Sequence, residues 1–208
     1  ICACLVGSEM CIRDRTKGMP LTIRTLDIGG DKDIPYMGLT KETNPFLGYR
    51  AIRFCLDRVD IFTTQLRAIL RASAYGSIRI MIPMITSVNE VRQVKDMIKK
   101  ICSDLDHNGI SYDKNIQTGV MIETPAAAIM ADAIAQEVDF FSIGTNDLTQ
   151  YTIAVDRCNE NVAYLYSAFN PAVLRLIRRI IECAHNAGIE AGTVSYTHLR
   201  AHETCADL

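Results

Sequence analysis

The chain has 208 residues, of which 22 are basic and 24 acidic, so its formal net charge at pH 7 is −2. This length suits a single domain, and 49% hydrophobic against 22% charged residues favours a buried core over disorder. The near-neutral charge argues against non-specific binding to nucleic acid or anionic membranes, and no apolar run approaches the roughly 18 residues of a membrane span.

Both ends of the chain lack the periodicity of a helix or a strand. Residues 4–15 (CLVGSEMCIRDR) and 194–204 (VSYTHLRAHET) look like translated sequencing-adapter read-through. We therefore expect a non-native, disordered leader over residues 1–15, a partial domain over residues 16–193 and a non-native tail over residues 194–208. The alternative, an ordinary polar tail, stays open on composition alone.

The middle of the chain alternates apolar segments with amphipathic ones. Four short segments rich in Ile, Val and Phe are predicted to be strands buried on both faces: 21–27, 78–84, 119–123 and 138–143. A fifth strand is expected to begin at residues 189–193. Four amphipathic segments are predicted to be helices: one over 60–74, one after the capping pair Ser87 and Glu90, one opened by Thr124–Pro125 and one opened by Asn170–Pro171. This alternation is typical of parallel βαβ units.

The eight cysteines do not form a disulfide pattern. Four lie near the ends, and Cys55, Cys102, Cys158 and Cys183 are scattered singly, with no CxxC pair and no histidine at zinc spacing. We expect free cysteines and a cytoplasmic protein.

Polar residues follow the predicted strands where each strand ends. Arg24 and Asp27 end the first strand, Glu123 ends the third, and Asn146 and Asp147 follow the fourth. Ligands bind at the carboxyl ends of strands in parallel α/β folds. Because neighbouring strands lie about 4.8 Å apart, Glu123 and Asp147 can converge on one cation, and two carboxylates with open positions suit Mg²⁺.

A structural alternative is that each carboxylate caps the next helix. Asp147 could do so, whereas Thr124 is better placed than Glu123.

Three arginines lie beside turns or strand ends, at Arg24, Arg50 and Arg157. Guanidinium groups bind phosphate through paired hydrogen bonds. The sequence alone does not separate them from the arginines of predicted solvated helix faces, which are Arg53, Arg58, Arg67 and Arg71. The residues thus indicate a Mg²⁺-dependent α/β site for a small phosphorylated or carboxylated anion.

Four sequence segments carry a resemblance to a known family: RTLDIGGDK (24–32), NPFLGYRAIR (44–53), GVMIETPAA (119–127) and DFFSIGTNDLTQYTIAVDR (139–157). They resemble the C-terminal, phosphoenolpyruvate-binding domain of Enzyme I of the bacterial sugar phosphotransferase system, the phosphoenolpyruvate-protein phosphotransferases. The similarity runs from about residue 19 to residue 192. Pyruvate phosphate dikinase and phosphoenolpyruvate synthase share the domain, but the Gly-Gly-Asp-Lys segment is more similar to Enzyme I.

The resemblance implies a parallel (βα)₈ TIM-type barrel, here incomplete with about five βα units. It implies that Mg²⁺ is held by Glu123 and Asp147. It also implies that phosphoenolpyruvate is bound by Arg24, Arg50, Asn146, Asp147 and Arg157. In this family the phosphoryl group passes to a histidine of an N-terminal domain, which this sequence lacks, and then to the phosphocarrier protein HPr. Family members are homodimers.

One departure from the family pattern concerns catalysis. The cysteine that protonates the pyruvate enolate in this family corresponds to Val194, which has no proton to give. None of the four histidines fits the phosphohistidine, and His107 and His185 are predicted to be surface residues. We therefore expect this chain alone to be inactive and poorly stable.

Three other readings stay open. The chain could be a fragment of a dikinase or synthase, a Mg²⁺-dependent carbon–carbon lyase of the barrel class, or a non-catalytic phosphoenolpyruvate-sensing module. The lyase does not predict three phosphate-directed arginines.

Overall fold

The computed structural model describes residues 20–29 and 42–194. These residues form two compact units, one made of the described residues up to Pro83 together with Arg92–Thr118, the other of Met84–Val91 and the described residues from Gly119 onward. The predicted non-native leader, residues 1–15, and the predicted tail, residues 194–208 apart from Val194, lie outside the described residues, so the predicted domain limits stay a prediction.

The first unit pairs two parallel strands. Strand β1 (Leu21–Arg24) lies in register with β2 (Ile78–Ile82), so that Leu21 is beside Ile78 and Arg24 beside Met81. Between them the chain forms η2 (Pro45–Leu47), α3 (Ile52–Asp57), α4 (Val59–Ala72) and η3 (Ser73–Tyr75). Helix α5 (Val88–His107) follows β2.

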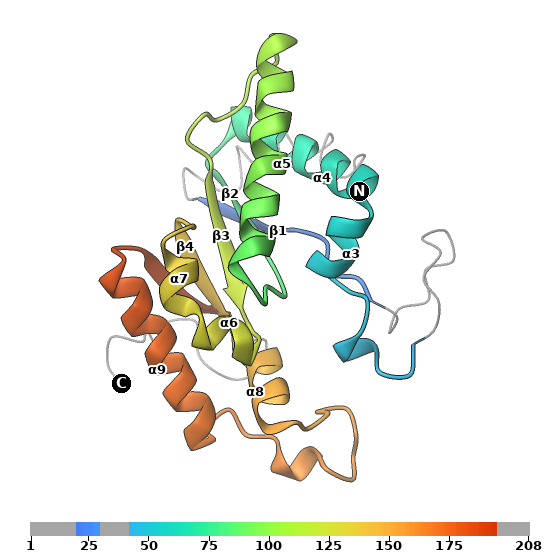
Figure 1. Ribbon diagram of the computed structural model, residues 1–208, viewed down its shortest axis with the longest axis vertical. Coiled ribbons are helices and arrows are strands. Elements are labelled where there is room, and N and C mark those ends of the chain that lie inside the picture. Colours follow the sequence, from blue (N-terminus) through green and yellow to red (C-terminus); the bar gives the residue numbers. More distant parts are fainter. Residues whose placement is uncertain (1–19, 30–41, 195–208) are drawn as a thin grey trace. The chain divides into compact units, whose positions relative to one another are not determined.

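The second unit has three parallel strands in the order β3-β4-β5, which are Gln117–Ile122, Phe140–Gly144 and Glu190–Val194. The other elements are α6 (Pro125–Ile129), α7 (Ala131–Ala135), α8 (Thr145–Ile153), η4 (Ala163–Leu165) and α9 (Pro171–Asn186). Helix α9 packs beside α6 and α7, as the orange and yellow ribbons of Figure 1 show. Its Arg179 donates to the Ile129 carbonyl at 2.8 Å, which ties α9 to α6.

The predicted helix starts are confirmed. The Asn170 side chain accepts from the Ala172 N–H at 2.9 Å, and Ser87 and Glu90 form the reciprocal capping box, with the Glu90 carboxylate accepting from the Ser87 N–H at 2.8 Å. The helix opened by Thr124 is interrupted at Met130, so two short helices replace the one predicted. Helices α3 and α8 were not predicted.

Burial follows the strand prediction only in part. Every residue of β4 is buried, as are the last five of β3, as expected for strands covered on both faces. Strand β1 is half-exposed, so the prediction of two buried faces is wrong for this strand. Strand β5, for which only its beginning was predicted, exposes Glu190, Gly192 and Thr193. Within the described residues β1 pairs with β2 alone and β5 pairs with β4 alone, so both are edge strands.

Two further sequence predictions concern the cysteines and membrane-spanning helices. Within the described residues Cys55, Cys102, Cys158 and Cys183 are free, as expected. No helix in the described part of the chain combines the length and apolar character that crossing a bilayer requires.

Two strand glycines allow a matched test of the second unit. A Cβ on Gly119 would lie 2.5 Å from the Phe140 ring, whereas a Cβ on Gly192 would meet nothing within 4 Å. Gly119→Ala should therefore lower the free energy of unfolding by about 1–3 kcal/mol, and Gly192→Ala should not lower it. Urea denaturation of the two variants measures this difference, and equal stabilities would contradict the packing of β3 against β4.

Candidate functional site

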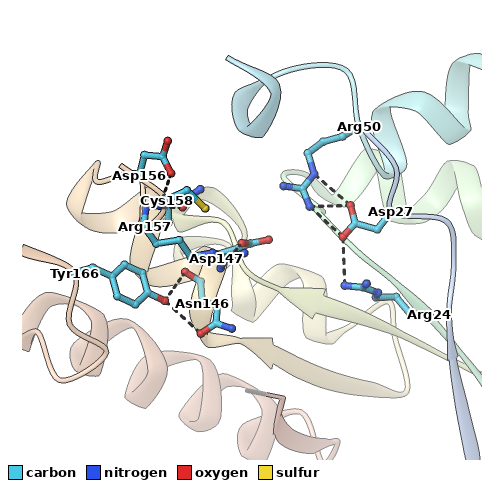
Figure 2. Close-up of polar contacts among 10 residues, drawn as sticks. Arg24, Asp27, Arg50, Asn146, Asp147, Asp156, Arg157, Cys158 and Tyr166 are labelled. Carbon is cyan, nitrogen blue, oxygen red and sulfur yellow. Dashed lines mark hydrogen bonds and ion pairs between the residues drawn. The ribbon is translucent and has the colours of Figure 1, made fainter. Parts of the chain in front are cut away.

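The predicted site residues fall into two groups, one in each unit. In the first unit, Asp27 is the shared partner of two of the three predicted phosphate-binding arginines (Figure 2). The Arg50 Nη2 atom donates to both carboxylate oxygens, at 2.8 and 3.0 Å, and Nε lies 3.2 Å from one of them. The Arg24 Nη1 atom lies 3.3 Å from the same carboxylate. Two positive charges therefore share one negative charge.

The loop that carries Asp27 is held by neighbouring elements. The Thr25 N–H donates to the Met81 carbonyl of β2 at 2.9 Å, the Leu26 N–H to the Gln65 side chain of α4 at 3.0 Å, and the Ala51 N–H to the Ile28 carbonyl at 3.2 Å. Since β1 ends at Arg24, Asp27 lies beyond the strand that was predicted to contain it.

Cys55 lies beneath this loop. Its thiol is fully buried and donates to the Leu26 carbonyl at 3.7 Å. Burial, with a contribution from the negative charge of Asp27, raises the pKa of the Cys55 thiol to about 12. The thiol is therefore protonated at neutral pH and acts as a small apolar side chain rather than as a nucleophile.

In the second unit, Glu123 follows β3 and is 3% exposed. Its Oε1 atom accepts from the Met84 N–H at 2.6 Å. Met84 has a φ of +59°, a conformation that non-glycine residues seldom adopt. The backbone before α5 thus takes a strained conformation and donates its N–H to the buried carboxylate.

The Glu123 side chain occupies the space that a side chain at position 144 would need. Since Ile122 lies in register with Ile143, Glu123 and Gly144 are the next residues along two neighbouring parallel strands. A Cβ on Gly144 would lie 2.7 Å from both Cβ and Oε2 of Glu123. The Glu123 side chain therefore lies against the carboxyl end of β4, where α8 begins.

Neither acidic residue serves as the helix cap of the structural alternative. The Thr124 side chain caps α6, accepting from the Ala127 N–H at 3.2 Å and donating to the Ile85 carbonyl at 2.8 Å. The N-cap of α8 is Gly144, and Asp147 is the third residue of that helix. Both carboxylates are buried, and neither is the N-cap residue of the helix that follows it.

Asp147 is paired with the third predicted arginine. The Arg157 Nη1 atom lies 3.1 Å from Asp147 Oδ1, and the N-terminal end of α8 adds favourable dipoles. Helix α8 ends at Ile153, and its C-cap residue Ala154 has a left-handed conformation with a φ of +54°. The Gln150 side chain then accepts from the Arg157 N–H at 3.2 Å, so the arginine ten residues after Asp147 returns to it.

Asn146, the second residue of α8, is held from a later loop. The Tyr166 hydroxyl lies 3.2 Å from the Asn146 carbonyl oxygen and 3.3 Å from its side-chain Oδ1 (Figure 2). Both residues are half-buried.

The donor set of the second unit suits a hard cation. Glu123 and Asp147 supply carboxylate oxygens, and Mg²⁺ is commonly held by one or two carboxylates with water or substrate oxygens completing its shell. In the part of the chain that the structure describes, no three His, Cys, Asp or Glu side chains form a metal-binding group. The two carboxylates alone are a donor set that fits Mg²⁺ with open positions.

Of the four arginines predicted to lie on solvated helix faces, three pair with groups of the chain. Arg53 donates to the carbonyls of Leu47 and Gly48, at 2.9 and 3.1 Å, rather than lying on a solvated face as expected. Arg58 pairs with Asp60 at the surface, and Arg67 pairs with Asp104. Arg71 is exposed, as are His107 and His185, all three as predicted.

Position 194 ends β5 in register with Gly144. The residue predicted to correspond to the family's proton-donor cysteine therefore lies on the strand beside the carboxyl end of β4.

Sequence reasoning missed four residues that position the others: Asp27 as the shared counter-charge, Met84, Gln150 and Tyr166. A carboxylate three residues after an arginine was the only signal for Asp27. The other three act through backbone groups or across turns, which leave no periodic pattern.

Comparison with known proteins gives one family. Residues 10–195 match the family model described as PEP-utilising enzyme, PEP-binding domain. Curated relatives named phosphoenolpyruvate-protein phosphotransferase include those of Priestia megaterium (54% identical, covering 87% of this chain and 32% of the relative) and Bacillus subtilis (55%, 85% and 31%). A relative of that name from Buchnera aphidicola is 57% identical, with coverage of 85% and 31%. The chain thus spans about a third of the length of these relatives, and the predicted resemblance is confirmed.

Solved structures of similar fold include a citrate lyase from Burkholderia xenovorans, with a TM-score of 0.52 and 21% identity over 66% of this chain and 42% of that one. The citrate synthase SbnG has a TM-score of 0.52 and 12% identity, with coverage of 91% and 74%. At these identities the likeness concerns the fold alone. It confirms the predicted fold class, an incomplete α/β barrel of parallel strands, of which five are described.

The shared carboxylate of the first unit gives a stability prediction. Asp27→Asn should lower the free energy of unfolding by about 3 kcal/mol, because the largely buried Arg50 loses its counter-charge. Asp60→Asn, which removes a solvent-exposed pair with Arg58, should leave stability nearly unchanged. Chemical denaturation at pH 7 compares the two. A similar small effect at both positions would show that the Asp27 pairs do not form in solution.

Proposed function

Because the chain belongs to the PEP-utilising enzyme family through its PEP-binding domain, we propose that it is the phosphoenolpyruvate-binding part of a Mg²⁺-dependent phosphoenolpyruvate-protein phosphotransferase. The observation that carries this proposal is the pair of buried carboxylates, Glu123 and Asp147, neither of which is a helix N-cap residue. Carboxylate oxygens at the carboxyl ends of neighbouring strands are the ligands that Mg²⁺ takes at substrate sites, together with water or substrate oxygens.

The two proposed metal ligands are held in place by different contacts. Glu123 is fixed by the Met84 N–H through one oxygen, and Oε2 lies against Gly144. Asp147 lies in the first turn of α8 and has Arg157 as its counter-ion. In the proposed function Glu123 and Asp147 are the metal ligands, and Mg²⁺ would neutralise charge on the phosphate and on the enolate oxygen of the substrate.

The arginines supply the phosphate contacts in this proposal. Arg24 is 40% exposed and lies 3.3 Å from Asp27, so its guanidinium can turn to an incoming phosphate. Arg50 is held by two of its nitrogens, and Arg157 is 35% exposed. Asn146 would add a neutral hydrogen bond to the substrate. These groups would hold the phosphoryl group and stabilise its charge as it moves.

The remaining steps belong to parts of the whole enzyme. In the proposed reaction the phosphoryl group leaves phosphoenolpyruvate for a histidine on a further, N-terminal domain and reaches HPr, the first step of sugar uptake in the cytoplasm. The pyruvate enolate left behind must gain a proton at carbon. Valine at position 194 cannot give one, so we expect this chain to bind the substrate without completing the reaction.

A carbon–carbon lyase is the weaker candidate. The lyase-type similarity concerns the fold alone. The pair Arg24 and Arg50 around one carboxylate favours a ligand with a phosphate group, which a lyase of this class does not require.

The metal assignment predicts a binding defect. The chain should bind phosphoenolpyruvate in the presence of Mg²⁺ and lose this binding in EDTA. Glu123→Gln and Asp147→Asn should each weaken Mg²⁺-dependent binding by about 30-fold, since each removes one charged ligand. Isothermal titration calorimetry measures the affinities. The control is Glu182→Gln, an exposed carboxylate on α9 of the same unit, which should bind as wild type. Wild-type affinity in both site variants would refute the metal ligands.

The phosphate assignment predicts a ligand-selective defect. Arg24→Gln should weaken phosphoenolpyruvate binding by about 10- to 100-fold and leave pyruvate, which has no phosphate, almost unaffected. Arg58→Gln is the matched control, because Arg24 and Arg58 are 40% and 41% exposed and each pairs with one carboxylate. Equal weakening for both ligands would show that Arg24 does not bind the phosphate.

A further inference from the structure

The contact between Tyr166 and Asn146 involves the only polar atom of the tyrosine side chain. The hydroxyl donates toward two oxygens of one residue, the Asn146 carbonyl at 3.2 Å and its side-chain Oδ1 at 3.3 Å. Tyr166 lies at the end of η4, twenty residues after Asn146, so the contact joins the loop before α9 to the first turn of α8 (Figure 2).

An asparagine side chain has two chemically opposite ends. Its oxygen accepts hydrogen bonds and its NH₂ group donates two. A rotation of the amide exchanges the two, so an asparagine at a binding site can meet a ligand with either. In Asn146 the oxygen is the end that faces the Tyr166 hydroxyl, which leaves the NH₂ group to other partners.

The loop that carries Tyr166 has its own internal support. The Asn159 carbonyl accepts from the Ala163 N–H at 2.9 Å, and the Ala163 carbonyl accepts from the Tyr166 N–H at 3.0 Å. Beyond it, the Asn170 side chain caps α9. The backbone position of Tyr166 is therefore fixed by hydrogen bonds other than the contact with Asn146.

We propose that Tyr166 is a positioning residue that fixes the orientation of the Asn146 amide, so that the N–H donors and not the oxygen are offered to the ligand. The inference rests on the proposed function, in which Asn146 contacts the substrate. With this orientation the site accepts a ligand rich in oxygen acceptors, a phosphate ester or a carboxylate, and disfavours one that presents N–H or O–H donors at that point.

The test without ligand uses the Asn146 side-chain NH₂ resonances in ¹⁵N–¹H spectra of the full chain, assigned by their loss in Asn146→Ala. Tyr166→Phe, which removes only the hydroxyl oxygen, should shift these resonances. Tyr164→Phe is the control, because Tyr164 is two residues away and 80% exposed, and it should leave them in place. Unchanged resonances in Tyr166→Phe would overturn the proposal.

The test with ligand is a double-mutant cycle on phosphoenolpyruvate affinity with Mg²⁺ present. Tyr166→Phe should weaken binding about fivefold, the worth of one neutral hydrogen bond. In the Asn146→Ala background the same change should cost nothing further, because Tyr166 acts through Asn146. Equal weakening in both backgrounds, or none in either, would overturn the proposal, since a purely structural tyrosine would not couple to Asn146.

Failure of the proposed function gives a different result. If the wild-type chain does not bind phosphoenolpyruvate while the Asn146 resonances respond to Tyr166→Phe alone, the proposed ligand is wrong and the orientation of the amide stands. If the ligand binds but neither the resonances nor the cycle responds, the proposed function stands and the role of Tyr166 is wrong.

Discussion

A carboxylate removed from water needs a counter-charge or hydrogen-bond donors, and this requirement governs both candidate groups of residues. In the first unit the need is met by two arginines, which Asp27 holds together through its two oxygens. In the second unit the Met84 N–H, given by a backbone at φ +59°, meets it for Glu123. Arg157 meets it for Asp147.

The same requirement connects the fold to the proposed chemistry. Glu123 can lie against the end of β4 because position 144 has no side chain, and Gly144 is also the N-cap of α8. The glycine therefore lets a buried carboxylate and a helix N-terminus meet at one strand end. Glu123 and Asp147 already have partners within the chain, so a bound cation would either displace these partners or share the carboxylates with them. Whether Arg157 is displaced from Asp147 would then affect the affinity for an anionic substrate.

Local sequence patterns predicted the elements that have strong local signals. The caps at Ser87, Thr124 and Asn170 were predicted correctly, because a capping side chain bonds to a backbone group two or three residues away. The strand positions were also correct to within a few residues. Helix α3 was missed because it has only six residues, and α8 because its amphipathic pattern is weak beside the polar string TNDLTQ. The burial of β1 was overestimated, since pattern alone does not say which strands lie at an edge.

The choice of candidate site residues came from the sequence, because a charged side chain at the carboxyl end of a buried strand is costly unless it meets a ligand or a partner. Their partners were decided by tertiary structure. Asp27 and Arg50 are 23 residues apart, Met84 and Glu123 39, and Asn146 and Tyr166 20. These contacts depend on strand register and on the left-handed conformations of Met84 and Ala154. A sequence pattern records neighbours along the chain, whereas a hydrogen bond between distant segments exists only once the register between their strands is set.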